Sequence, residues 1–502
     1  MQFDLDAGMA VSSALPQFHV VGFTGHRRVA DPERVRQQIA AALDSLLDHD
    51  KVEWLAVSSA AEGSDLIFAE EVLKQGLPWE VLLPLPLIDF KQDFTEAVWP
   101  AVEKIFSRAA DSRVVAQEGD REEAYLDCGI ETVNACDVLI AIWDGEPARG
   151  PGGTADVVTF ARELKRPLIV IDPETGQERR ENFEHHSPVD EELAFLNALP
   201  EQAINTTRAP SDALALVSRF MAKTDHAATK GAPKFRLLTV AAVVLHLFAT
   251  LVATFGLAFH WHPLGLAWSK LLFVLGALGA ALAIRHLRAQ DTWVRCRLAA
   301  ELARAVLATW GMTRKTALFE DVDMPETRQL LRSLHVLHKR ETKGRRSNLD
   351  TFRQHYRVNR LDDQLAYYRK RLAKAEPQLA QLRFGFGVAT LLAILTTAAY
   401  ALHSTFYFFE ISEILKSTFF YFLPIVLPVV AATFISFISI NDLHRRVARY
   451  REMCQLLESV QKQIMVTHSW RSLEQLVRRT ERALLQEVLE WHTLMSHLEA
   501  HH

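Results

Sequence analysis

Residues 137–164 read DVLIAIWDGEPARGPGGTADVVTFAREL and decide the fold of the front of the chain. A short apolar run leads into a glycine-rich loop, and the loop opens into a segment whose apolar residues recur at helical spacing. Near-continuous apolar runs of this length are typical of strands that are buried on both faces of a parallel sheet. The stretch therefore predicts a strand, a loop and a helix, in the order that parallel α/β sheets repeat.

The same alternation extends on both sides of this stretch. Short apolar runs predict strands at 18–23, 54–59, 79–85, 113–117, 137–143 and 167–172. Amphipathic segments between them predict helices at 32–49, 64–75, 92–110, 121–135 and 154–165. The pattern predicts a doubly wound, mostly parallel sheet, in which ligands bind beyond the carboxyl ends of the strands.

Three loops that follow strands suit an anionic ligand: GFTGHRR (22–28), SSAAEGSD (58–65) and the glycine-rich loop at 143–156. Glycines let the backbone approach a ligand closely, and free N–H groups at the start of a helix attract phosphate. Arginines donate to anions, and aspartates accept hydrogen bonds from ribose or base. The candidate ligand-binding residues are Gly22, Thr24, Gly25, His26, Arg27, Arg28, Glu62, Gly63, Ser64, Asp65, Asp144, Gly145, Gly152, Gly153, Thr154 and Asp156. For the first two loops, a surface turn and a helix cap without ligand remain the alternatives.

The formal net charge of −5 hides an uneven distribution. Residues 1–180 hold 17 Lys and Arg against 32 Asp and Glu, whereas the rest of the chain holds 39 against 29. The acidic front offers nothing to neutralise the phosphates of a nucleic acid, so we expect no nucleic-acid binding. The four cysteines are widely spread, as in a reducing compartment. The pair His185 and His186 lacks a third ligand, so we predict neither a metal site nor a cofactor.

Four long apolar segments predict membrane-spanning helices in two hairpins. They lie at 237–260, 264–284, 384–409 and 417–440, and Lys270 is the only Asp, Glu, Lys or Arg among them. A helix needs about 20 apolar residues to cross the hydrocarbon core, so each segment is long enough. Buried helices of a soluble protein are the alternative, but four such runs exceed what a soluble core needs.

Charged flanks predict the orientation of the spans. The hairpin tips carry almost no Lys or Arg, and the other span ends carry Lys230, Lys234, Arg236, Arg285, Arg288, Arg295, Arg297, Arg383, Arg445, Arg446, Arg449 and Arg451. The positive-inside rule then places both termini in the cytoplasm. The N-terminal residues show neither the basic start nor the apolar run of a signal peptide, so we expect the front domain to stay there too.

Two features of the rear half bear on how it is built. RCRLAAELARAV (295–306) follows the second span and RYREMCQLLESV (449–460) follows the fourth, which indicates a duplicated module. A coincidence between two basic juxtamembrane helices is the alternative. Pro424 and Pro428 lie within the fourth span, where each removes a backbone donor, so they predict a kink.

Several motifs carry a family resemblance. GFTGHRR, EGSD and IWDGEP–GPGGTADVV resemble the SLOG superfamily, a Rossmann-like group related to LOG nucleotide phosphoribohydrolases. The paired spans, the arginine-rich helices and RVNRLDDQLAYYRKRL (357–372) resemble SLATT two-transmembrane effector modules. The resemblance implies a sensor for a nucleotide-derived or NAD-derived signal, joined to modules that perturb the bacterial inner membrane in anti-phage defence or conflict.

The resemblance also implies a domain plan. We expect a SLOG-like domain at 17–175, a linker with short helices at 176–233, a first two-helix module at 234–310, a connector at 311–351 and a second module at 352–498.

One departure bears on catalysis. The hydrolases carry a PGGxGTxxE-like loop whose Glu serves the chemistry, and here Val157 stands where that Glu would fall. A valine cannot transfer a proton, so hydrolysis is disfavoured and no catalytic residue is assigned, although Asp156, Glu62 or Asp65 could substitute.

Three functional hypotheses follow. The first is a ligand-gated membrane effector that acts as a homo-oligomer in the lipid bilayer, because four spans are too few to enclose a sizeable pore. The second is a membrane-tethered nucleotide hydrolase of the LOG type. The third is a constitutive membrane scaffold or transporter, whose front domain serves only assembly.

Overall fold

The structure is a computed structural model, and it is described here in two compact units. The front unit comprises Leu15–Phe195, and the rear unit includes Leu196–His502. The described residues are 14–47, 52–116, 120–148, 152–201, 212–286, 289–312, 325–342, 347–406 and 412–500.

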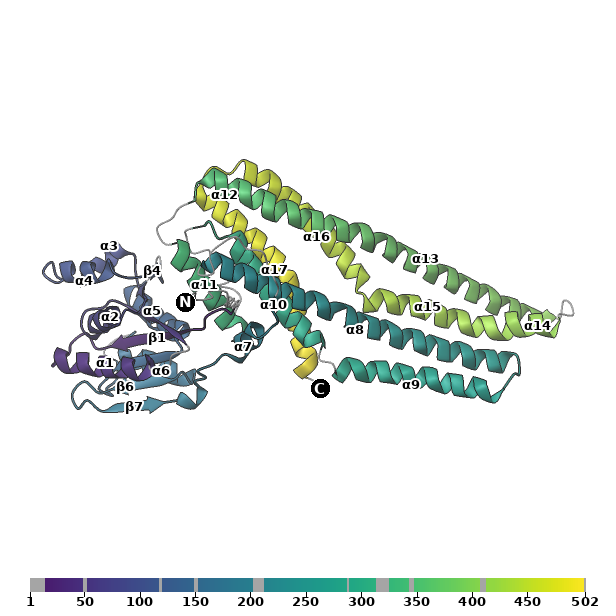
Figure 1. The fold of residues 1–502 in the computed structure, drawn as a ribbon, viewed down its shortest axis with the longest axis horizontal. Helices are drawn as coiled ribbons and strands as arrows, with labels where there is room; N and C mark the ends of the chain where they lie inside the picture. Colours follow the sequence, from purple (N-terminus) through teal and green to yellow (C-terminus); the bar gives the residue numbers. More distant parts are fainter. Residues whose placement is uncertain are drawn as a thin grey trace, which may run out of the picture. The chain divides into compact units, whose positions relative to one another are not determined.

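The front unit is built on one seven-stranded sheet, and the predicted doubly wound, mostly parallel fold is confirmed (Figure 1). The strand order is β4-β3-β2-β1-β5-β6-β7, and all neighbours pair in parallel except β6 and β7. The strands are β1 (Phe18–Gly25), β2 (Glu53–Ser58), β3 (Trp79–Leu83), β4 (Asp111–Val114), β5 (Val138–Ile142), β6 (Leu168–Ile171) and β7 (Glu178–Glu181). The chain reverses direction across the sheet between β1 and β5, which is where ligands bind in such folds.

Two hydrophobic cores lie on the two faces of the sheet. One contains residues of α1 (Pro32–Leu47) and α2 (Ser64–Lys74), and the other contains residues of α5 (Arg121–Ala135) and α6 (Thr154–Glu163). Neighbouring residues of β1 divide between them, with Val21 in the first core and Val20 in the second. This alternation explains why the strands read as continuous apolar runs: both of their faces are buried.

The front unit differs from the sequence prediction in three places. The fourth strand was predicted at 113–117 and lies instead at Asp111–Val114 (β4). The antiparallel edge strand β7 has the sequence ERRE, and its charged side chains lack the apolar pattern by which the other strands were found. The single helix predicted at 92–110 is instead broken into α3 (Leu87–Phe90), a 3-10 turn at Lys91–Asp93, and α4 (Trp99–Phe106). Pro100 lies in the first turn of α4, where a proline is tolerated but cannot continue a preceding helix.

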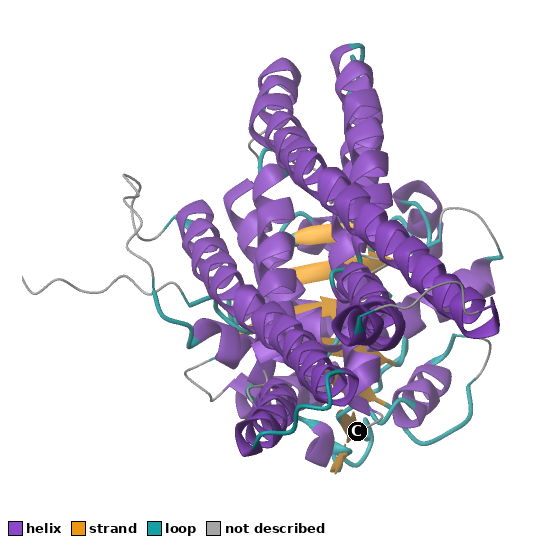
Figure 2. Cartoon of the chain, turned by 90° about the vertical axis from the view of Figure 1, so that its right-hand side faces the viewer, coloured by secondary structure: helices purple, strands orange, loops and turns teal. Residues whose placement is uncertain are grey.

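The described residues of the rear unit beyond α7 (Glu191–Asn197) are helical or irregular, as the purple helices of Figure 2 show. One long helix, α8 (Ala213–Ala258), runs without interruption from the linker into the first span. The other helices are α9 (Leu264–His286), α10 (Ala289–Ala308), α11 (Arg328–Thr342), α12 (Leu349–Tyr356), α13 (Asp363–Phe406), α14 (Glu413–Lys416), α15 (Leu423–Ile440), α16 (Leu443–Met465) and α17 (Trp470–Ala500). Two π-helical turns, η4 (Arg357–Asp362) and η5 (Ser417–Phe422), interrupt the α-helical pattern.

Four helices are long and apolar enough to cross a membrane, as the sequence predicted. They form a row in the order α9, α8, α15 and α13, in which α8 packs on α9 and α15, and α15 packs on α13 (Figure 1). Aromatic side chains gather near the hairpin tips: the Phe255 and Trp261 rings lie 6.0 Å apart, and the Tyr400 and Phe420 rings lie 5.6 Å apart. Such residues are enriched at membrane–water interfaces.

The prolines of the fourth span follow the π-helical turn η5. Pro424 lies in the first turn of α15, and Pro428 lies inside α15, which remains helical. The kink predicted from these prolines stays a prediction. Of the flanking cations used to predict orientation, Lys234, Arg236, Arg285 and Arg288 lie outside the described side chains.

Candidate functional site

A pocket of about 770 Å³ lies at the carboxyl ends of β1, β2 and β5, next to the switch point of the sheet. The loops after these three strands all contribute to its lining. The predicted residues that line it are Thr24, Gly25, His26, Arg27, Arg28, Asp65, Asp144, Gly152, Gly153 and Thr154. Residues 149–151 of the glycine-rich loop lie outside the described residues.

Six predicted residues do not line the pocket, and three of these hold its loops together. The Ser64 hydroxyl donates to the backbone carbonyl of His26 over 2.9 Å, which ties the second loop to the first. Gly63 has φ +98°, and a side chain there would meet the Arg27 carbonyl oxygen at 2.3 Å. Asp156 Oδ2 accepts the backbone N–H of Gly152 at 3.0 Å, which fixes the turn that precedes α6.

The remaining three predicted residues have other surroundings. Gly22 is buried within β1, where a Cβ would lie 2.7 Å from the Cβ of Cys136, so it serves strand–helix packing. Gly145 has φ +88° and belongs to the turn after β5, and Glu62 lies beside the pocket without lining it.

His26 and Asp144 join the first and third loops across the switch point. His26 Nε2 lies 3.2 Å from both the backbone nitrogen and Oδ1 of Asp144. Burial raises the pKa of Asp144, but the backbone N–H of Glu146 and the His26 ring outweigh burial and hold that pKa below its ordinary value. The pocket rim therefore carries a carboxylate that is ionised at neutral pH.

Two arginines offer positive charge at the pocket. Arg27 and Arg28 are exposed, and within the described part of the chain neither guanidinium forms an ion pair. The Arg27 guanidinium lies 4.8 Å from the centre of the Tyr125 ring, which orients it by a cation–π contact. Unpaired guanidinium groups beside the N-terminus of α6 suit a phosphate group.

Sequence reasoning missed a second group of lining residues, namely Asp93, Arg121 and Tyr125. Arg121 forms an ion pair with Asp93, and the Tyr125 hydroxyl donates to the same carboxylate. Arg121 and Tyr125 belong to the first turns of α5, and Asp93 belongs to the turn after β3. No glycine-rich loop or known motif contains these three residues. The one feature of the sequence that could have identified them is that they follow strands whose carboxyl ends meet at this edge of the sheet.

Asp65 is the most buried carboxyl group of the pocket, with an exposed fraction of 4%. Burial raises its pKa to about 7, although Ser59 Oγ donates to Oδ1 over 2.9 Å and so favours the ionised form. Of the three acids that could replace the missing Glu, Asp156 is bonded to the loop and Glu62 lies outside the pocket. Asp65 alone of the three lines it.

The raised pKa makes the stability of the front unit depend on pH. Between about pH 3.8 and 7, folded Asp65 keeps a proton that the unfolded chain has released, so stability falls as the pH rises across this interval and levels off above about pH 7. Asn is neutral, as protonated Asp65 is, so we expect Asp65→Asn to raise the melting temperature at pH 8. The gain should vanish below about pH 4, where Asp65 is protonated in both the folded and the unfolded chain. Calorimetry of the full chain measures this, with the exposed Asp127→Asn as control; an equal gain at both pH values would contradict the assignment.

Val157 also lines the pocket, but its position is apolar. It is 2% exposed, and a side chain at Gly129 would meet its Cγ2 at 2.5 Å. The position that holds the catalytic Glu in the LOG-type loop is therefore packed against a neighbouring helix. Among the described residues no group of three His, Cys, Asp or Glu is placed to hold a metal ion. The arrangement can bind an anionic ligand through backbone N–H groups and arginines.

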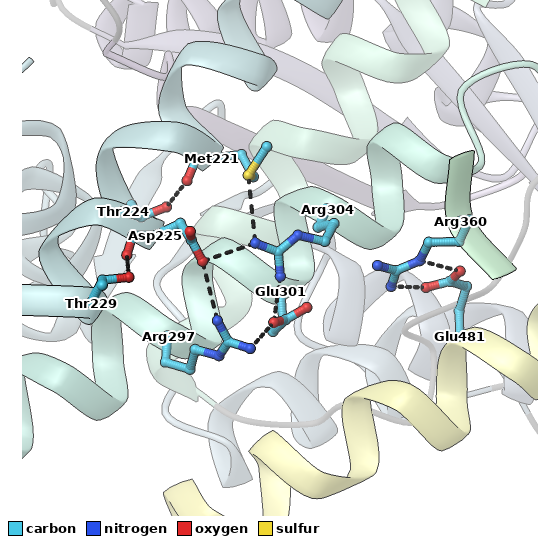
Figure 3. A network of polar contacts seen from close by, with 9 residues as sticks. All are labelled: Met221, Thr224, Asp225, Thr229, Arg297, Glu301, Arg304, Arg360 and Glu481. Carbon is cyan, nitrogen blue, oxygen red and sulfur yellow. Dashed lines mark hydrogen bonds and ion pairs between the residues drawn. The ribbon is translucent and has the colours of Figure 1, made fainter. Parts of the chain in front are cut away.

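A second polar centre lies among the helices of the rear unit (Figure 3). Asp225 of α8 accepts from Arg297 at 3.1 Å and from Arg304 at 2.9 Å, and Glu301 pairs with the same two arginines. Arg360 and Glu481 form another ion pair. Arg360 donates from Nε to Glu481 Oε1 at 2.9 Å and from Nη2 to Oε2 at 2.6 Å. Their side chains are 5% and 0% exposed. The Tyr356 hydroxyl donates to the same Glu481 carboxylate at 2.8 Å.

The fold and the site define a class: a Rossmann-like sheet domain with a pocket at its switch point, on one chain with a helical membrane region. Residues 356–491 match the model of the family described as SMODS and SLOG-associating 2TM effector domain 1. The matched part begins at the end of α12 and ends in α17, so it covers the second hairpin with its cytoplasmic helices. No curated protein matches the chain.

The match confirms the SLATT resemblance for the second module, and the first module, expected at 234–310, stays a prediction. It indicates a membrane protein, and a membrane-active effector of conflict or defence systems. No SLOG family model matches the front unit, so the SLOG resemblance stays a prediction that rests on the motifs quoted above.

Proposed function

We propose that the chain is a ligand-gated membrane effector. The pocket of the front unit binds a nucleotide-derived or NAD-derived signal, and binding causes the spans to open a pore in the bacterial inner membrane or to disrupt it. The observation that carries the proposal is one chain that joins an effector-type hairpin, at 356–491, to a sheet domain with an anion-suited pocket at its switch point. The role in anti-phage defence or bacterial conflict is what the SLATT resemblance implies.

The long helix α8 supports coupling between signal and membrane. It begins at Ala213, within the expected linker at 176–233, and its last part is the first span, Leu237–Ala258. A continuous helix transmits a displacement of its first turns to its far end, whereas a flexible linker would absorb it. The ligand must bind the active state more tightly, and a difference of about 3 kcal/mol shifts the two populations by more than about a hundredfold.

The row of spans supports a homo-oligomer. In the described residues the edge helices α9 and α13 each pack extensively on one neighbouring span only, α8 and α15 respectively. An open row of four helices encloses no channel, so a pore requires several copies of the chain. We place both termini in the cytoplasm, in keeping with the positive-inside rule.

Dye-loaded vesicles that contain the full chain test the proposal. We expect one compound of a panel of nucleotides, NAD derivatives and cyclic nucleotides to be retained by the protein unchanged and to trigger dye release. Arg27→Ala together with Arg28→Ala should raise the concentration required at least about tenfold, because two charge-assisted contacts are lost. Arg108→Ala removes an exposed arginine outside the pocket and should change nothing.

Two outcomes would contradict the gated effector. Retention without dye release would leave the constitutive scaffold in place. Release of free base from the bound compound would favour the hydrolase, and Asp65 is the observation that keeps that alternative open, because it is a protonatable carboxyl group inside the pocket. Asp65→Asn should then abolish base release.

A further inference from the structure

Arg121, Asp93 and Tyr125 are joined by hydrogen bonds at one side of the front-unit pocket, and all three line it. Arg121 Nε donates to Asp93 Oδ1 at 3.1 Å, and its Nη2 donates to the same oxygen. The Tyr125 hydroxyl donates to Asp93 Oδ2. A guanidinium fork beside a hydroxyl is also a donor set that suits a phosphate group. The Asp93 carboxylate therefore takes the place on these donors that phosphate oxygens would take.

Asp93 is carried by a short segment and not by a strand of the sheet. It is the last residue of the 3-10 turn Lys91–Asp93, which follows α3 directly. The segment is anchored before this turn by Phe90, which is fully buried in the core. Arg121 Nη2 also donates to the backbone carbonyl of Asp89 at 3.1 Å. Arg121 thus holds two points of the segment against α5.

Tyr125 brings a second guanidinium to the same place. The Arg27 guanidinium lies 4.8 Å from the centre of the Tyr125 ring, and its charge also acts on Asp65, without an ion pair among the described contacts. Burial and the bond to Asp93 raise the pKa of Tyr125, so its hydroxyl keeps its proton at neutral pH and donates. One guanidinium at the ring and another beside the hydroxyl match a ligand that carries two neighbouring anionic groups.

We propose that Arg121 and Tyr125 form a second anion subsite of the pocket, and that Asp93 competes with the ligand for it. A ligand with two adjacent phosphates, such as a nucleoside diphosphate, places one phosphate at Arg27, and the other displaces the Asp93 carboxylate from Arg121. The segment Leu87–Asp93 then loses its hold on α5. The proposal rests on the proposed function, because it concerns the same pocket, but it requires no action of the spans.

Calorimetric titration of the full chain in detergent with inorganic pyrophosphate tests the competition. We expect Asp93→Asn to tighten pyrophosphate binding about tenfold, because a carboxylate that holds Arg121 in about nine of ten molecules lowers the apparent affinity by that factor. In the Arg121→Gln background, the same substitution should change the affinity less than about twofold, since no guanidinium is released. Glu96→Gln removes an exposed carboxylate outside the pocket and should leave the affinity unchanged.

Limited proteolysis of the unsubstituted chain gives a second readout. Trypsin cleaves after lysine, and Lys91 is exposed two residues before Asp93. Ligands that only tighten a fold slow such cleavage, because cleavage follows the population of the open form. Pyrophosphate should instead accelerate cleavage after Lys91, because it releases the segment from Arg121.

Several results would overturn the proposal. They are an absence of pyrophosphate binding, an affinity that Asp93→Asn leaves unchanged or lowers, a gain that persists in the Arg121→Gln background, and slower cleavage after Lys91 in pyrophosphate. All of these measurements concern binding alone. A protein that passes them but releases no dye from vesicles would contradict the gated effector and leave the subsite in place.

Discussion

Glu481→Ala will lower the free energy of unfolding of the rear unit by about 3–5 kcal/mol. The substitution leaves the Arg360 guanidinium, which is 5% exposed, as an unpaired charge inside the helical core. It also removes the acceptor of the buried Tyr356 hydroxyl. Arg360 Nη1 already lacks a hydrogen-bond partner among the described residues, and the Glu301 carboxylate acts on Arg360 only through its charge, without a hydrogen bond among the described contacts. Thermal unfolding of the full chain in detergent, followed by circular dichroism, measures the loss.

Glu376→Ala is the matched control for this prediction. It removes a carboxylate from the pair with Arg451, whose side chains are 58% and 42% exposed, so we expect a loss of about 0–1 kcal/mol. Arg360→Met combined with Glu481→Met replaces both charges with apolar groups and should recover most of the stability. A loss below about 1 kcal/mol for Glu481→Ala would mean that the pair is hydrated and not buried.

Gly152→Ala will weaken ligand binding at the pocket about a hundredfold or more, because it displaces the loop that precedes α6. Gly152 has φ +76°, and a Cβ there would lie 2.6 Å from the Leu126 nitrogen and 2.9 Å from the Tyr125 carbonyl carbon. Both are backbone atoms of α5, which cannot yield as a flexible side chain can. The loop must therefore move away from α5, and the N–H groups at the start of α6 move with it. Titration of the full chain with the compound that it retains measures the effect.

Gly76→Ala separates this clash from the strain of the backbone alone. Gly76 has φ +77°, but nothing lies within 4 Å of its would-be Cβ, and it lies outside the pocket. Alanine there carries only the conformational cost of about 1–2 kcal/mol, and we expect ligand affinity to stay unchanged. If Gly152→Ala binds as tightly as the control, the glycine-rich loop does not hold the ligand.

The central strands could be predicted in detail because they are buried on both faces. Val138–Ile142 and Leu168–Ile171 are apolar at every position, and the helix boundaries of α5 and α6 follow from plain amphipathic spacing. Strand β7 could not be found, because an edge strand needs no apolar face and ERRE shows none. The membrane spans, like the strands, were predictable because each is a continuous run of apolar residues.

The pocket was predictable only where a motif marks it. The loops after β1, β2 and β5 contain glycines that a tight backbone requires, whereas Arg121 and Tyr125 lie on an ordinary helical face. The Arg360–Glu481 pair joins residues 121 positions apart, and the π-helical turn that carries Arg360 leaves no mark on the periodicity. Partners so distant in the sequence become visible only when the helices have packed.

The length of α8 and the place of Asp225 along it together make a lever. At about 1.5 Å per residue, Asp225 lies about 18 Å from the first residue of the helix and about 50 Å from its last residue. Its bonds to Arg297 and Arg304 tie the helix to α10 at that point, in addition to the packing of α8 on its neighbours. If α8 tilts about Asp225, the outer end of the first span moves about three times as far as the first turn, and in the opposite direction.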